Sequence, residues 1–204
     1  MTILLLTKIV LVCLLGAMSP GPSMVVVVNN AIYKNKFNGI LTAIGHGIGI
    51  GVYALFAVIG IGLIIKTNLF LFNGIKILSV FFLFYLGLQA IFKSKKLDFE
   101  KNTIKYGVKS FFEGFGISIL NPKILIWFLA IYSQFMSVNN DNILNISLIL
   151  IASLVDALWY ILLVNLVTAK SILEKIKQKS ELIQKLIGCL FIIISIVLTI
   201  GLIK

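Results

Sequence analysis

The stretch "AMSPGPSMVVVVNN", residues Ala17 to Asn30, places two prolines and a glycine inside a long apolar run. Apolar residues lead up to this stretch from Ile3 and continue beyond the prolines to Val28. Proline inside a helix removes a backbone hydrogen bond and clashes with the preceding turn, at a cost of about 3 kcal/mol or more. The sequence therefore predicts a long apolar helix that is broken near its middle.

Composition places this broken helix in a membrane. The chain has 204 residues, of which 60% are apolar and 12% are charged, whereas soluble domains carry about 25% charged residues. The mean hydropathy is +1.10, and apolar runs of the roughly 20 residues needed for one span recur along the chain. We expect an all-α integral membrane protein, embedded in the lipid bilayer, with six transmembrane helices at 3–30, 39–65, 74–92, 111–136, 143–168 and 182–203.

The basic residues indicate the orientation of these spans. The net charge is +11, and 13 of the 18 lysines fall in the first, third and fifth connections. Lysine accumulates on the cytoplasmic side of membrane proteins, which predicts that both termini face outward. The charge is therefore explained without nucleic acid. The lysine-rich stretch Lys170 to Lys185 also has apolar residues at helical spacing, and we expect it to lie on the inner headgroups as an amphipathic extension.

The second half of the chain contains a matching break. All three prolines interrupt apolar spans: Pro20 and Pro22 the first, and Pro122 the fourth, 100 residues after Pro22. A repeat of three helices explains this spacing, and because three is odd, the second copy enters the membrane from the opposite side. The sequence predicts one transmembrane domain over 1–204, built as a 3+3 inverted repeat of 1–100 and 101–204 with broken first and fourth helices.

Matched breaks in inverted halves point to a transporter's binding site. Backbone groups freed at a break must be satisfied by protein, water or ligand. The N-terminus of each second half-helix carries a partial positive charge. The backbone after Pro22 and after Pro122 can therefore receive an anionic group such as a carboxylate.

Lys123 and Asp156 are the charged residues deepest within the predicted spans, and His46 is the only histidine of the chain. Lys123 and Asp156 are too costly to face lipid and form either a structural ion pair or part of the site, where Asp156 binds an ammonium group, carries a coupling proton, or does both in alternation. His46 is either a buried core residue or a proton relay, with Tyr53, two turns later, as a candidate partner.

Glycines and cysteines in the spans carry mainly packing information. Two small-xxx-small pairs, Gly45 with Gly49 and Gly47 with Gly51, allow neighbouring helices to approach closely. The two cysteines lie far apart in apolar spans, and no spacing typical of a metal site occurs. We expect no metal and no cofactor.

The chain resembles the lysine exporter (LysE/RhtB) family of amino-acid efflux proteins over essentially its whole length. The matching pieces are "GAMSPGP" (16–22), "GILTAIGHGIGIG" (39–51), "NPKILIWFLAIYSQF" (121–135) and "DALWY" (156–160). The resemblance implies an inner-membrane location, export of amino acids or related compounds, and proton coupling. It also implies that the transport path is lined by Pro20, Gly21, Pro22, Asn121, Pro122, Lys123 and Asp156. Ser23 departs from the Asn or Asp usual in the family, which leaves the substrate open.

The function expected is therefore a secondary exporter of amino-acid-like metabolites by proton antiport, not an enzyme, with Ser23 added to the substrate-binding residues and Asp156 and His46 in proton coupling. Two alternatives stay open, a transmembrane thiol-redox carrier and a passive channel. The oligomeric state also stays open, a homo-oligomer included.

Overall fold

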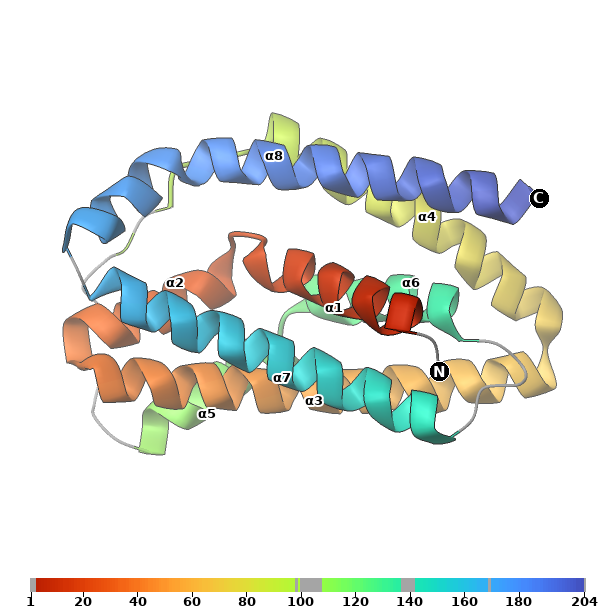
Figure 1. The fold of residues 1–204 in the computed structure, drawn as a ribbon, viewed down its shortest axis with the longest axis horizontal. Coiled ribbons are helices and arrows are strands. Elements are labelled where there is room, and N and C mark those ends of the chain that lie inside the picture. The colour runs from red at the N-terminus through yellow and green to blue at the C-terminus, as the bar shows by residue number, and fades with distance from the viewer. Residues whose placement is uncertain (1–2, 98, 100–107, 137–141, 169, 204) are drawn as a thin grey trace.

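A computed structural model of the chain describes residues 3–97, 99, 108–136, 142–168 and 170–203, and the secondary structure within these ranges is helical throughout (Figure 1). The elements are α1 (Ile3–Met18), α2 (Pro22–Asn29), the π-helix η1 (Asn30–Lys34), α3 (Lys36–Thr67), α4 (Leu69–Phe92), α5 (Val108–Ile119), α6 (Pro122–Phe135), α7 (Asn142–Val167) and α8 (Lys170–Ile203).

Both predicted breaks are present. The helix pair Leu4–Met18 and Pro22–Lys34 bends by 71°, and the pair Lys109–Ile119 and Lys123–Phe135 bends by 61°. Four further helices, α3, α4, α7 and α8, are long and apolar enough to cross a membrane, which gives six spans if each bent pair counts as one. The chain is thus an all-α integral membrane protein. α1 begins and α8 ends at the same end of the bundle, as an even number of spans requires (Figure 1).

The lysine-rich stretch 170–185, which we expected to be an amphipathic extension on the inner headgroups, forms the first half of α8, a single helix of 34 residues. Its location on the headgroups stays a prediction. A helix of this length extends about 50 Å, well beyond an apolar core of about 30 Å.

α7 shows how the spans divide lipid-facing from buried surface. Leucines spaced four apart, at positions 150, 154, 158 and 162, are each at least half exposed, as expected for a stripe that faces lipid. On the opposite face Ala152, Asp156 and Tyr160, again four residues apart, are buried. Since residues four apart lie on one helix face, the leucine stripe itself turns Asp156 into the protein.

α3 is the scaffold against which α5 and α7 pack, while α4 and α8 form a second pair alongside (Figure 1). The two glycine pairs of α3 serve different neighbours, in agreement with their predicted packing role. Gly45 lies against the backbone of Phe111 in α5, whereas a Cβ on Gly47 would come within 2.6 Å of the Ala157 Cβ in α7. His46, between these two glycines, is therefore held where α5 and α7 both come close to α3.

Buried apolar side chains form two clusters, one on each side of the helix breaks. The larger cluster contains Ile9 of α1, Trp127 of α6 and Phe191 of α8. The smaller cluster contains Val27 of α2 and Val164 of α7. The two breaks thus lie between two packed apolar layers.

The close approach of α3 and α5 predicts that Gly45→Ala destabilises the protein. The added Cβ would overlap the carbonyl of Phe111, and overpacking of this kind costs about 1–3 kcal/mol. We expect the melting temperature in detergent to fall. Gly60→Ala, in the same helix with open space around the glycine, is the control. Equal melting temperatures for the two variants would contradict the role assigned to Gly45.

Candidate functional site

The two helix breaks meet inside the protein. Lys123, in the first turn of α6, donates from Nζ to the hydroxyl oxygen of Ser19 in the first break, over 2.8 Å. A cavity opens at this junction, and its walls come from both breaks and from α3, α7 and α8. The lining residues are Cys13, Gly16, Ala17, Ser19, Gly21, Pro22, Ser23, His46, Ile50, Asn121, Lys123, Ile124, Trp127, Phe128, Ala152, Asp156, Tyr160 and Phe191.

The two half-helix N-termini differ in how they are capped. At α6, the side-chain oxygen of Asn121 accepts a hydrogen bond from the backbone N–H of Lys123, over 3.1 Å. At α2, Gly21 occupies the cap position and no side chain caps the helix. The first N–H groups of a helix have no partner within it. The start of α2 is therefore the better place for an anionic ligand.

Ser23, in the first turn of α2, adds a donor at the same place. Its side chain is buried and lines the cavity, and its hydroxyl lies near the Tyr160 hydroxyl without a well-formed hydrogen bond within the described part of the chain. A buried polar atom without a partner costs free energy. A ligand in the cavity can supply the missing partner.

Asp156 and His46 form a buried pair on another wall of the cavity. His46 Nδ1 and Asp156 Oδ2 lie 2.6 Å apart, and the side chains are 2% and 7% exposed. The edge of the His46 ring packs against Tyr160, with ring centroids 4.9 Å apart. The second ring nitrogen, Nε2, is buried without a hydrogen-bond partner among the described residues. The pair thus presents both a carboxylate and a free imidazole nitrogen.

The prediction that Tyr53 is the partner of His46 was wrong. Tyr53 instead donates its hydroxyl to the carbonyl of Ile119, the last residue of α5. Tyr53 therefore fastens the end of the half-helix that precedes the second break.

Lys123 and Asp156, which we considered as an ion pair, have separate partners. Lys123 bonds to Ser19 and Asp156 to His46, and no ion pair between the two is among those of the described residues. The cavity therefore has a cationic wall at the breaks and an acidic wall on α7. Seven of the nine predicted site residues line it. Pro20 lies in the first break outside the lining, and Pro122 begins α6.

The apolar part of the lining was not predicted from the sequence. Trp127, Phe128 and Phe191 form this part, and the rings of Trp127 and Phe191 pack with centroids 4.9 Å apart. Phe191 comes from the last helix, where nothing in the sequence marks it. Tyr160 could have been found, because it lies one helical turn after Asp156 on the same face.

The two cysteines do not pair with each other in the structure. Cys13 and Cys189 are both free thiols, with Cys13 in the cavity lining. The described residues contain no group of three His, Cys, Asp or Glu side chains that could hold a metal ion.

Comparison with known proteins identifies the family of this chain. It is 26% identical over 186 residues to the uncharacterized membrane protein YrhP of Bacillus subtilis, covering 85% of this chain and 88% of that protein. It is 27% identical over 180 residues to the leucine efflux protein of Salmonella typhimurium, covering 85% and 84%. No solved structure matches significantly. The model of the LysE type translocators matches residues 14–201, and the chain belongs to this family.

Proposed function

We propose that this protein is a secondary transporter that exports amino acids or related small metabolites across the inner membrane in exchange for protons. One observation carries the proposal: a single cavity at the two helix breaks is lined by Lys123 on one wall and by Asp156 on another. The leucine efflux proteins among its relatives support amino acids as the substrate class.

The charges of the cavity suit a zwitterion. The carboxylate of an amino acid fits the wall formed by Lys123 and the uncapped start of α2, where Ser23 offers a hydroxyl. The ammonium group fits Asp156. Charges removed from water need opposite charges and hydrogen bonds around them. A solute that brings one charge of each sign satisfies both walls at once, whereas an uncharged solute satisfies neither.

Proton exchange follows from competition for Asp156. The carboxylate can hold a proton or face an ammonium group, and holding both at once is unfavourable. His46 is hydrogen bonded through Nδ1 to this carboxylate, and its Nε2, which has no partner among the described residues, is available to pass a proton. Binding of the substrate and release of a proton are thereby linked at one carboxylate.

The arrangement in the membrane belongs to the same proposal. We assign both termini to the outer side, because lysine gathers in the odd-numbered connections. The halves 1–100 and 101–204 form an inverted repeat in this assignment. The bend of the first and of the fourth span, at positions 100 residues apart, supports it.

The role of Asp156 predicts that Asp156→Asn abolishes transport while the protein still reaches the membrane. Removing the charge leaves the substrate ammonium without a counter-charge, and breaking a buried pair in this way costs about 3–5 kcal/mol of interaction free energy. A loss of this size lowers the transport rate by at least about 100-fold. The measurement is initial uptake of radiolabelled leucine and lysine into proteoliposomes under an imposed pH gradient. Glu181→Gln, which removes an exposed carboxylate of α8, is the control. Full transport by Asp156→Asn would rule out an ionisable role for Asp156.

Export itself is tested in cells. Loaded with amino acids by dipeptide feeding, cells that lack this gene should retain more of at least one amino acid than cells that overexpress it. Unchanged efflux across a full amino-acid panel would contradict the proposal. Saturation of uptake in proteoliposomes, and its dependence on the pH gradient, distinguish a carrier from a passive channel.

A protein without cysteines distinguishes the transporter from the redox carrier, because only the redox carrier would lose its function. A thiol-redox carrier needs exchangeable thiols, and the free thiols here lie on α1 and α8. We expect the double variant Cys13→Ala, Cys189→Ala to transport at a rate within about twofold of the unchanged protein, since a free cysteine behaves as a small apolar side chain that alanine can replace. Complete loss of function in a correctly inserted double variant would revive the redox carrier.

A further inference from the structure

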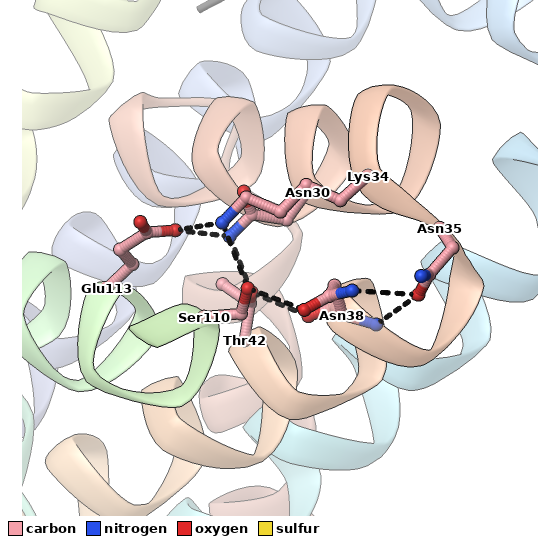
Figure 2. Close-up of polar contacts among 7 residues, drawn as sticks. All are labelled: Asn30, Lys34, Asn35, Asn38, Thr42, Ser110 and Glu113. Atoms are coloured by element: carbon pink, nitrogen blue, oxygen red, sulfur yellow. Dashed lines mark hydrogen bonds and ion pairs between the residues drawn. The ribbon is translucent and has the colours of Figure 1, made fainter. Parts of the chain in front are cut away.

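A second group of polar residues lies at the far end of α2, away from the cavity (Figure 2). Glu113 of α5 accepts two hydrogen bonds on Oε2, from Lys34 Nζ and from Asn30 Nδ2, each over 2.8 Å. Lys34 and Asn30 are the last and first residues of η1. The charged pair therefore ties the end of the first span to α5, the first half-helix of the fourth span.

The hydrogen bonds continue from this pair into α3. Lys34 Nζ also donates to the hydroxyl of Ser110 over 2.9 Å, and Ser110 donates to the side-chain oxygen of Asn38 over 2.9 Å. Asn30 Nδ2 donates to Thr42 over 2.7 Å. The residues joined in this way, Asn30, Lys34, Asn38, Thr42, Ser110 and Glu113, come from η1, α3 and α5 (Figure 2), and we call them the polar latch.

Burial makes the latch a strong closure. The side chain of Lys34 is 2% exposed and that of Glu113 is 22% exposed. A charge in such surroundings must stay paired, because an unpaired one is strongly unfavourable. A buried ion pair seldom stabilises a fold better than apolar side chains of the same volume. Its presence between two half-helices therefore suits a contact that is made and broken.

Two unsatisfied oxygens lie beside the latch. The side-chain oxygens of Asn29 and Asn30 are buried and form no hydrogen bond among the described residues. Such atoms cost free energy while α2 and α5 are together, and water satisfies them once the two helices part. These two oxygens therefore destabilise the closed latch, which brings the closed and open arrangements closer in free energy.

The local backbone can accommodate such a movement. Residues Asn30–Lys34 form a π-helix, in which the N–H of Asn35 donates to the carbonyl of Asn30 over 3.2 Å. π-helical turns are rare and occur frequently at functional sites. A change between π and α winding here would turn Asn30 and Lys34 relative to Glu113.

The opposite side of the cavity is closed differently. There the ring of Trp127 in α6 lies against α1, because a Cβ on Gly16 would lie 2.8 Å from the Trp127 ring nitrogen. The ion pairs of the described residues include none between α1 and α6. An ion pair therefore joins half-helices on one side of the cavity, and apolar packing joins them on the other.

We propose that the Lys34–Glu113 pair is the gate that closes the transport cavity on the side of the lysine-rich connections, and that it opens in each cycle. This inference rests on the proposed transport function, because the cycle in which the gate opens is the transport cycle. In the arrangement described, the Lys34–Glu113 pair is formed, which corresponds to the closed gate.

A natural cysteine provides the test. Cys189→Ala leaves Cys13, in the cavity lining, as the single thiol. In this background, a charged, membrane-impermeant methanethiosulfonate is applied to membrane vesicles from the face that carries Lys34, and modification of Cys13 is followed by mass spectrometry. Glu113→Gln keeps the shape but removes the charge, and we expect modification to be about tenfold faster because a two-state equilibrium shifts toward open.

Matched variants separate gating from general loosening. Glu181→Gln breaks the other Lys–Glu pair, which is exposed and lies within α8, and should leave the modification rate unchanged. The charge-swapped double variant Lys34→Glu, Glu113→Lys restores an ion pair and should return the rate toward that of the starting protein. Equal rates for Glu113→Gln and Glu181→Gln would overturn the gate.

The test does not depend on transport. Faster modification of Cys13 in Glu113→Gln, in a protein that moves no amino acid, would leave the gate standing and remove the transport function. Amino-acid transport by a protein whose Cys13 modification rate is unchanged in Glu113→Gln would support the transport function and remove the gate. If Glu113→Gln fails to insert into the membrane, the charge-swapped double variant alone provides the test. Faster modification of Cys13 in that double variant than in the starting protein would contradict the gate.

Discussion

Polar groups inside a bilayer must find their partners within the protein, and most of this structure follows from that constraint. Two spans are interrupted by proline, and polar side chains at the two breaks meet each other inside the protein. Lys123 of the second break bonds to Ser19 of the first, while Asn121 caps the half-helix that follows it. Ser23 and His46 Nε2 have no well-formed hydrogen bond to the residues that the structure describes, and both residues line the cavity, where a solute can supply a partner.

The glycines of α3 make this arrangement compact enough to work. α5 lies on one side of α3 at Gly45 and α7 on another at Gly47, a spacing that larger side chains would prevent. Between the two contacts, His46 reaches Asp156 over 2.6 Å. A hydrogen bond this specific, from a helix in the first half of the chain to one in the second, depends on packing at the neighbouring glycines rather than on the pair itself.

The cavity and the polar latch lie at the two ends of the same half-helix. α2 begins at the cavity with an uncapped N-terminus and leads directly into η1, where Lys34 and Asn30 hold Glu113. A ligand that satisfies the start of α2 therefore acts on the element that carries the latch. This continuity offers a short mechanical route by which occupancy of the cavity can bias the proposed gate.

How much could be predicted depended on whether the signal was local. Composition and the three prolines were sufficient for an all-α membrane protein with broken first and fourth spans, because hydrophobicity and proline act within a few residues of where they stand. The same local reasoning marked Lys123, Asp156 and His46, since any charge inside a span needs a partner. Nothing in the sequence, by contrast, marks Glu113 and Lys34 as partners, because they lie 79 residues apart.

Which groups become partners was decided only by the tertiary structure. Asp156 pairs with His46 and not with Lys123, and Lys34 pairs with Glu113, because helix rotation and the close contacts along α3 set which faces meet. Phe191 reaches the cavity from the last helix for the same reason. The sequence by itself determined that charges are buried and that two helices break. The packing of helices far apart in the chain determined where those charges meet, because a residue type specifies its need for a partner but not its position in space.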